Sequence, residues 1–324
     1  MRILSGIQPS GALHLGNYFG MMRPAIELQE RGEAFYFIAD YHALTTVRDP
    51  AKLREFVNEV AIDFLACGLD PKKSVFFRQS DVPEVTELAW LLSCLTPMGL
   101  LERCHSYKDK ISRGLAASHG LFAYPVLMAA DILIYDSDLV PVGKDQKQHL
   151  EVARDIAIKV NEAYGEDVLR LPEASIREEV ATVPGVDGRK MSKSYNNTID
   201  LGGDDKALKK RIMSIVTDST PVEAPKPIEQ SLILPLYRLV AQPDEIKQME
   251  QDHLKGGFGY GDFKKRLLTA VLEYFGEMRE QKQSWITRPD EVEDILQHGA
   301  KRARTLAQAT LGRVRKAVGL NAQS

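Results

Sequence analysis

The chain has 324 residues, with 42 lysines and arginines against 45 aspartates and glutamates, and a formal net charge of -3. This length exceeds what one hydrophobic core usually supports, so we expect two domains, and the charge balance excludes a histone-like, strongly basic coat protein. Hydrophobic residues at 44% and charged residues at 27% are ordinary for a globular protein and exclude a disordered one.

Strand and helix patterns alternate along the first half of the chain. Short apolar or β-branched runs predict strands at Arg2–Ile7, Ala34–Ala39, Ser74–Phe77 and Asp138–Val142. Apolar residues at helical spacing predict helices at Gly16–Arg31, Ala51–Cys67, Glu84–Arg103 with an interruption at Pro97, 126–135 and Asp145–Tyr164. Strands separated by such helices form βαβ units, so we predict an α/β fold with a parallel sheet.

The pattern changes near residue 185, and only helical patterns follow. Helices are predicted at Ala207–Val216, Ile233–Ala241, Pro243–Leu254, Phe263–Lys282 and Pro289–Val318. Two glycine-rich turns, GVDG and GGDD, precede them, and the proline-rich stretch Pro221–Pro227 predicts a loop. We therefore expect a smaller all-α domain after the α/β domain.

Basic residues gather at the C-terminal end. No acidic residue follows Asp294, and residues 295–324 carry six lysines and arginines. This pattern is equally consistent with a solvated helix face and with a patch that faces a polyanion.

Cysteine usage and hydropathy bear on the compartment. Cys67, Cys94 and Cys104 include no C-x-x-C pair, which indicates neither a disulfide framework nor a four-thiolate metal site. The N-terminal apolar run is too short for a signal peptide, and the longest apolar stretch, between Leu121 and Ala130, is broken by Pro125. We expect a cytoplasmic protein with reduced thiols.

The first candidate motif, Gly6–Tyr18 (GIQPSGALHLGNY), follows the first predicted strand and opens the first predicted helix. Its glycines allow close approach of the backbone to a ligand, and a helix N-terminus favours an anion. His14 and Asn17 add hydrogen-bond donors. An ordinary glycine-rich turn is the alternative interpretation.

The second candidate motif is Lys190–Ser194 (KMSKS), in a polar loop after the GVDG turn. Two lysines three residues apart suit a loop that closes over a polyphosphate, because lysine is a compact, movable charge. A plain solvent-exposed loop is the alternative.

Together the two motifs carry a resemblance. His14-Leu15-Gly16-Asn17 is similar to the first signature of the class I aminoacyl-tRNA synthetases, and Lys190–Ser194 is identical to the second, in the same order. A third block, Tyr124–Leu133 with Val140–His149, resembles the tryptophanyl-tRNA synthetase family, and the likeness extends over nearly the whole chain.

Asp131 is a lone carboxylate inside an apolar segment of this third block. A buried carboxylate needs a partner, or its pKa shifts. An indole N–H only donates, so an acceptor at the base of an apolar slot would recognise tryptophan. The alternative is that Asp131 pairs with a structural arginine or caps a helix.

The resemblance implies a role for each matching residue. Asp131 would accept the indole N–H, Met128, Val140 and Val142 would line the ring, and Tyr124 and Gln146 would hold the α-amino end. The implied ATP-binding residues are Gln8, Pro9, Ser10, Gly16, Asn17, Gly143, Lys144, Asp145, Val183, Lys190, Met191, Ser192, Lys193 and Ser194, with Lys110 as a further phosphate-side lysine. Catalytic roles fall on His14, Asn17, Lys190 and Lys193. Two residues depart from the pattern of the family: Leu4 stands where many relatives have phenylalanine, and Lys144 stands where an acidic residue is common.

The implied activity is that of a tryptophan–tRNA ligase. Tryptophan and ATP, with Mg²⁺ held mainly by the triphosphate, would give the adenylate and pyrophosphate, and tryptophan would then pass to the 3′ end of tRNA. The implied organisation is a Rossmann-like nucleotide-binding domain at 1–186, a mobile lysine loop at 187–195, a helical anticodon-recognition domain at 196–285 and a basic helix at 286–324 that packs back on the catalytic domain. A homodimer with contacts around 83–103 is implied, and an iron–sulfur cluster is not, since Cys94 and Cys104 are too widely spaced.

Four alternatives stay open at this point. They are a tyrosyl-tRNA synthetase, a relative that makes an adenylate but charges no tRNA, a small nucleotidyltransferase with the same first signature, and a non-enzymatic tRNA-binding module. The helical second domain and the basic tail disfavour the nucleotidyltransferase, and the intact lysine loop disfavours the binding module.

Overall fold

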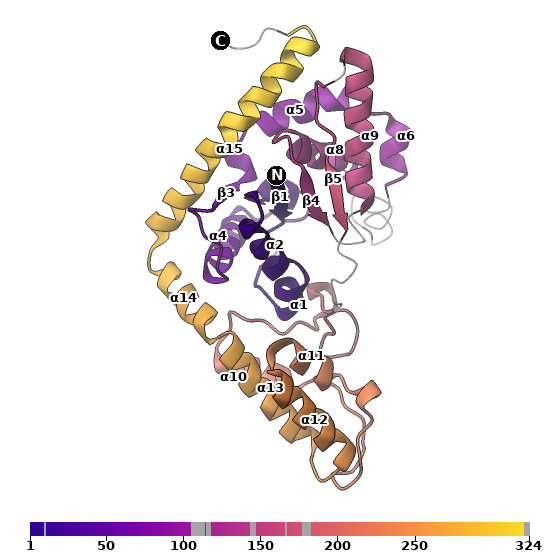
Figure 1. The fold of residues 1–324 in the computed structure, drawn as a ribbon, viewed down its shortest axis with the longest axis vertical. Coiled ribbons are helices and arrows are strands. Elements are labelled where there is room, and N and C mark those ends of the chain that lie inside the picture. The colour runs from indigo at the N-terminus through magenta and orange to yellow at the C-terminus, as the bar shows by residue number, and fades with distance from the viewer. Residues whose placement is uncertain are drawn as a thin grey trace.

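The computed structural model describes residues 1–9, 11–104, 114, 118–142, 147–165, 167–176 and 183–320. At its centre lies a five-stranded sheet of order β3–β2–β1–β4–β5 (Figure 1). Its strands, all parallel, are β1 (Arg2–Ile7), β2 (Glu33–Ile38), β3 (Ser74–Arg78), β4 (Leu139–Val142) and β5 (Glu173–Ile176). The predicted α/β fold with a Rossmann-like sheet and a C-terminal helical part is confirmed. The short strand β5, with its glutamate, alanine and serine, was not predicted.

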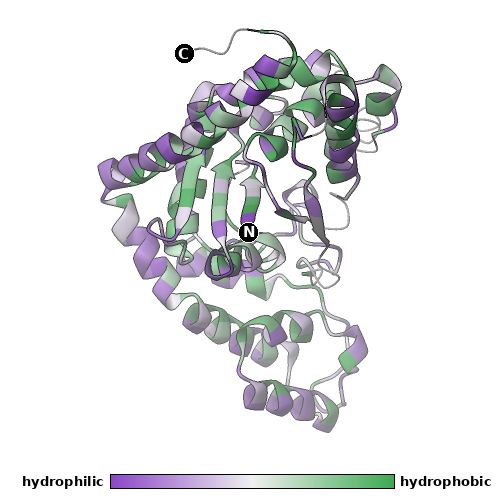
Figure 2. Ribbon diagram, turned by 45° about the horizontal axis from the view of Figure 1, so that its top comes forward, coloured by the Kyte–Doolittle hydropathy of each residue, from purple (hydrophilic) through white to green (hydrophobic). Residues whose placement is uncertain are grey.

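Successive side chains of a strand point to opposite faces, and helices cover both faces of this sheet. Tyr36 and Phe76 share a core with α4 (Pro50–Ala66). Phe35 and Phe77 share a second core with α5 (Glu84–Ser93), α8 (His119–Leu133) and α9 (Lys147–Tyr164). Figure 2 shows the strands as mainly hydrophobic, as this double covering requires.

Several predicted helices have different bounds in the structure. The run predicted at Gly16–Arg31 is α1 (Leu15–Asn17), a π-helical turn η1 (Tyr18–Met22), α2 (Arg23–Glu27) and a 3₁₀ turn η2 (Leu28–Glu30). The interruption at Pro97 is confirmed, and α6 (Met98–Glu102) follows it. The helix predicted at 126–135 begins earlier, because Ser118 accepts the Leu121 N–H and caps α8 there. Two short elements, α3 (Asp40–Ala43) and the 3₁₀ turn η3 (Gln79–Asp81), were not predicted.

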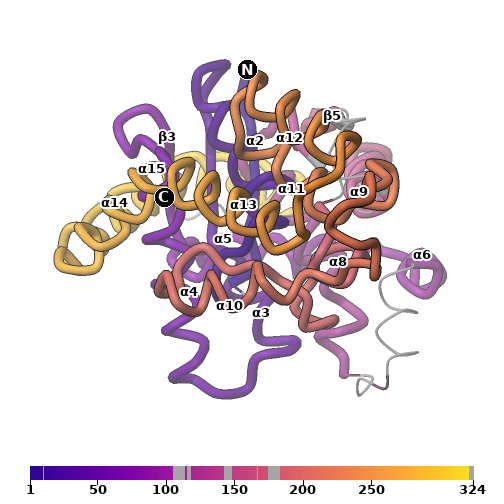
Figure 3. The backbone as a smooth tube through the Cα atoms, turned by 90° about the horizontal axis from the view of Figure 1, so that it is seen from below, coloured from indigo at the N-terminus to yellow at the C-terminus, as the bar shows by residue number. Residues whose placement is uncertain are grey.

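Helices α10 to α13 gather at one end of the molecule, as Figure 3 shows from that end. The second half contains 3₁₀ turns η5 (Lys193–Tyr195) and η6 (Ile228–Gln230) and helices α10 (Asp205–Met213), α11 (Ile233–Val240), α12 (Pro243–Lys255), α13 (Tyr260–Tyr274), α14 (Gly276–Ile286) and α15 (Pro289–Ala317). The prediction of a single helix at Phe263–Lys282 is wrong, because α13 ends and α14 begins around Phe275. The Phe275 ring packs edge-on against the Tyr18 ring, with the ring centroids 4.9 Å apart. Among the described residues, no helix is long and apolar enough to span a membrane.

Helix α15 lies along β3, the edge strand of the sheet (Figure 1). A helix that covers an edge strand protects its backbone groups from pairing with another chain. Three basic residues of the C-terminal stretch form ion pairs with the α/β domain: Arg304 with Glu84, Arg313 with Asp136 and Arg315 with Glu87. The charge of this stretch is therefore partly neutralised where α15 meets that domain.

Gly299 is the point of closest approach between α15 and β3. A Cβ atom at this position would lie 1.9 Å from the carbonyl oxygen of Phe76. We therefore expect Gly299→Ala to lower the free energy of unfolding by about 2–3 kcal/mol, because the helix must move off the strand. Gly312→Ala is the matched control on the same helix, since its Cβ would meet nothing within 4 Å. Gly312→Ala should raise the free energy of unfolding by about 0.5–1 kcal/mol, because alanine has a higher helix propensity than glycine. Urea unfolding of both variants measures the difference. Equal effects would contradict this close packing.

Candidate active site

A cavity of about 520 Å³ opens where the strand order reverses, between β1 and β4. In open parallel sheets this switch point is where ligands bind, beyond the carboxyl ends of the strands. Residues predicted for the tryptophan or ATP site that line it are Gln8, Asn17, Tyr124, Met128, Asp131 and Val140. Leu4, the residue that stands where many relatives have phenylalanine, also lines it. Residues far apart in the sequence therefore share one cavity.

Asp131 is a buried carboxylate in the wall of this cavity, with 2% of its surface exposed. Its Oδ2 lies 2.8 Å from Nε2 of His42, and the Gln79 amide donates to Oδ1 at 2.8 Å and to Oδ2 at 2.9 Å. Burial raises the pKa of Asp131, and the hydrogen bonds from His42 and Gln79 act against this rise. The alternative partner, a structural arginine, is not what the structure shows. A carboxylate accepts about four hydrogen bonds, so Asp131 retains capacity for a donor in the cavity.

His42 and Gln79 were missed by the sequence analysis. Each follows a strand closely: His42 belongs to α3 after β2, and Gln79 opens η3 after β3. The backbone N–H of Tyr41 donates to the side-chain oxygen Oε1 of Gln79 at 3.1 Å, which directs the Gln79 side-chain nitrogen toward Asp131. Polar residues just beyond two neighbouring parallel strands were the signal that could have indicated them.

Tyr124 stands on the same helix as Asp131 and also lines the cavity. Its hydroxyl lies 3.0 Å from Nε2 of His149, and its ring meets that of His42 edge-on with centroids 6.2 Å apart. Leu4, Met128 and Val140 are among the apolar residues that form much of the remaining wall. The cavity therefore combines an apolar slot with a few polar groups at fixed positions, which is typical of small-molecule sites.

The first signature begins α1 with His14 as its N-cap. The Asn17 backbone N–H donates to Nδ1 of His14 at 3.2 Å, so that ring nitrogen acts as an acceptor. The Leu15 N–H donates to the Ile199 carbonyl at 3.0 Å, which holds the first signature against the chain that follows the lysine loop. The Leu15 and Asn17 N–H groups at the start of α1 therefore already have partners within the protein.

The second signature packs directly on the first. The Gly16 N–H points at the Met191 sulfur at 3.3 Å, and Met191 is buried while Lys190 and Lys193 are exposed. Ser192 caps η5 by accepting the Ser194 N–H at 3.3 Å. A Cβ built on Gly11 would lie 3.6 Å from Nζ of Lys193, so this ammonium lies beside the glycine-rich turn at the cavity. Burial lowers the pKa of Lys193, and the carboxylates of Glu59 and Asp200 oppose that shift.

Some predicted residues lie elsewhere. Val183 is buried, and its carbonyl accepts the Met191 N–H at 2.9 Å. Neither Val183 nor the buried Pro9 lines the cavity, and the same holds for His14, Gly16 and residues 190–194. Val142 ends β4. Outside the described residues lie Ser10, Lys110, Gly143, Lys144, Asp145 and Gln146.

His14 is uncharged at neutral pH in this structure. Burial and the nearby Lys193 lower its pKa to about 4. We therefore expect the His14 ring resonances to stay constant from pH 8 to pH 5 and to shift only near pH 4. Because the unfolded ring takes up its proton near pH 6.5, this residue makes folding less favourable as pH falls from there toward 4. Titration of His14 by NMR measures this, and a midpoint near 6.5 would contradict it.

Comparisons with known proteins fit this geometry. The family model described as "tRNA synthetases class I (W and Y)" matches residues 1–276. The chain is 54% identical over 319 residues to the tryptophan–tRNA ligase of Fusobacterium nucleatum, covering 98% of both chains. It is 55% identical over 320 residues to that of Rhodopirellula baltica, covering 99% of this chain and 100% of the relative. A crystal structure of tryptophanyl-tRNA synthetase from Campylobacter jejuni, complexed with ADP and tryptophan, superposes with a TM-score of 0.95 at 53% identity, covering 99% of this chain and 100% of that one.

Proposed function

Because the chain belongs to the tryptophan and tyrosine family of class I tRNA synthetases, we propose that it is an ATP-dependent tryptophan–tRNA ligase. It activates tryptophan with ATP to the adenylate and then transfers the amino acid to the 3′ end of tRNA. The observation that carries tryptophan over other amino acids is Asp131, a buried acceptor that faces an otherwise largely apolar cavity.

The indole N–H is matched by the remaining acceptor capacity of Asp131, which His42 and Gln79 hold in place. The ring lies along Met128, Val140 and Val142, with Tyr124 and Gln146 at the α-amino end. A site that hydrogen-bonds a substrate N–H rejects analogues without it by about 10⁴–10⁵, so no editing site is needed.

ATP lies across the two signatures. Its phosphates lie at the α1 N-terminus beside His14 and Asn17, under Lys190 and Lys193 of the loop. The other ATP contacts are Gln8, Pro9, Ser10, Gly16, Gly143, Lys144, Asp145, Val183, Met191, Ser192 and Ser194. ATP enters as its Mg²⁺ complex, with the cation held mainly by the triphosphate.

The first step needs positioning and charge stabilisation and no covalent intermediate on the protein. The tryptophan carboxylate attacks the α-phosphorus in line, and pyrophosphate leaves toward the loop lysines, whose charge offsets what develops there. In the second step a terminal tRNA hydroxyl attacks the carbonyl of the mixed anhydride and releases AMP.

We propose that residues 196–285 face the anticodon and that the enzyme acts in the cytoplasm as a homodimer. The residues around 83–103 support the dimer, because Trp90 and Met98 are 69% and 63% exposed there although both are large and apolar.

Aminoacylation of tRNA is the test that covers both steps. Purified enzyme should charge tRNA from a bacterial extract with radiolabelled tryptophan and with no other amino acid. Formation of the adenylate without charging would make the protein an adenylate-forming relative, and charging with tyrosine would make it a tyrosyl enzyme.

A further inference from the structure

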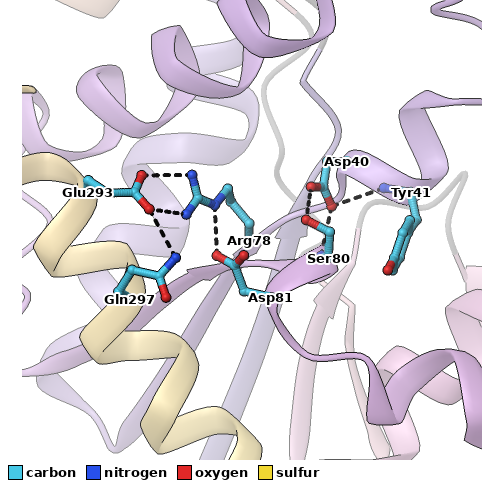
Figure 4. Close-up of polar contacts among 7 residues, drawn as sticks. All are labelled: Asp40, Tyr41, Arg78, Ser80, Asp81, Glu293 and Gln297. Carbon is cyan, nitrogen blue, oxygen red and sulfur yellow. Dashed lines mark hydrogen bonds and ion pairs between the residues drawn. The ribbon is translucent and has the colours of Figure 1, made fainter. Parts of the chain in front are cut away.

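Arg78 joins helix α15 to the turn that follows β3. Its Nη1 and Nη2 donate to the two carboxylate oxygens of Glu293 on α15, at 2.8 and 2.5 Å, and its Nε donates to Asp81 in η3 at 2.7 Å (Figure 4). Gln297, one turn along α15, donates to the same Glu293 carboxylate at 3.0 Å. A two-point arginine–carboxylate contact fixes geometry as well as charge.

The residue after Arg78 is Gln79, whose amide donates to Asp131. Gln79 is 1% exposed, and its side-chain oxygen Oε1 accepts a hydrogen bond from the Tyr41 N–H. On the other side of the same turn, Asp40 accepts hydrogen bonds from the backbone N–H and the hydroxyl of Ser80. The turn Gln79–Asp81 is therefore held from two sides: by Asp40, and by α15 through Arg78 (Figure 4).

We propose that Arg78 and Glu293 are positioning residues for the amino-acid site: they fix the turn from which Gln79 orients the Asp131 carboxylate. This inference rests on the proposed function, because it concerns how that site reads an indole N–H. Neither residue lines the cavity, so both act through Gln79.

Helix α15 is suited to this role because it packs closely against β3. Gly299 lies against the Phe76 carbonyl two residues before Arg78, so the helix cannot approach or slide without moving the end of β3. The helix also continues from α14, where Lys282 forms an ion pair with Asp63 of α4 at 2.6 Å. The placement of Gln79 therefore depends on a helix that runs on from the helical end of the molecule.

The first variant is Glu293→Ala, which should fold because the Glu293 side chain is 49% exposed on a helix surface. We expect the KM for tryptophan in pyrophosphate exchange to rise by about five- to tenfold, with the KM for ATP unchanged within about twofold. The preference for tryptophan over its benzothiophene analogue, in which sulfur replaces the indole N–H, should fall by a similar factor. Arg78→Lys keeps the charge but loses the two-point contact with the Glu293 carboxylate, so it should act in the same direction.

Two control variants separate positioning from simple stability. Glu291→Ala removes the same side chain from the same helix. Within the part of the chain that the structure describes, the only ion pair of Glu291 is with the neighbouring Arg288. Arg315→Gln breaks another ion pair between α15 and the α/β domain, the one with Glu87. Neither should change the preference against the analogue, even where the melting temperature falls as far as in Glu293→Ala.

Three results would overturn the inference. They are an unchanged analogue preference in both Glu293→Ala and Arg78→Lys, an equal rise in the KM values for tryptophan and ATP, and the same loss of preference in Arg315→Gln. An unmodified enzyme that shows no exchange with tryptophan would instead refute the proposed function.

Discussion

Replacing Lys193 with alanine is expected to lower the rate of adenylate formation by about 10²–10³, the usual cost of removing one charge-stabilising group from a transition state. The Lys193 ammonium lies beside the Gly11 turn of the first motif, and we place the ATP phosphates under this lysine. Partial burial of this ammonium lowers its pKa, and the carboxylates of Glu59 and Asp200 oppose that shift. The effect should fall mainly on kcat, because the leaving pyrophosphate gains charge only as the reaction proceeds.

Single-turnover formation of the adenylate under saturating ATP measures this loss. Lys209→Ala on α10 is the matched control, since Lys209 is an exposed lysine outside the site. An adenylate rate equal to that of the unmodified enzyme would show that the loop lysine takes no part in the first step.

Replacing Asp131 with alanine is expected to lower kcat/KM for tryptophan by about 10³ or more while the KM for ATP changes by less than about threefold. The loss has two sources. The indole N–H loses its acceptor, and the donors of His42 and Gln79 are left without theirs, which costs about 1–3 kcal/mol for the buried Gln79 amide.

Asp131→Asn distinguishes recognition from folding. The amide keeps the shape and one oxygen acceptor, so the protein should fold and retain more activity than Asp131→Ala. Pyrophosphate exchange at varied tryptophan and at varied ATP concentrations measures the effects on the two substrates separately. Asp155→Ala on the exposed face of α9 is the control. Equal damage to the use of both substrates would identify Asp131 as a structural carboxylate.

Local patterns were sufficient to predict much of the fold. The aromatic run in β2 and the helical spacing in α4 are properties of short segments, and both elements lie where they were predicted. The break at Phe275 could not be predicted, because it is set by packing against Tyr18 from the other end of the chain. Strand β5 was missed since its four residues include no apolar run.

The candidate site also combines residues that local sequence patterns indicate with residues that they do not. The two signatures and Asp131 could be proposed for the site from the sequence, because the signatures are contiguous motifs and Asp131 is a lone carboxylate in an apolar segment. His42 and Gln79 could not, since they stand on elements of a few residues that only the sheet brings to Asp131. The contact between Arg78 and Glu293 spans 215 residues of sequence and depends on α15 lying along β3.

The central claim is that this cavity activates tryptophan, and ATP–pyrophosphate exchange in the presence of each amino acid in turn tests it most directly. We expect exchange with tryptophan and, at the same concentration, a rate with tyrosine or phenylalanine at least about 10⁴ lower. Exchange with tyrosine at a comparable rate, or no exchange with tryptophan, would contradict it.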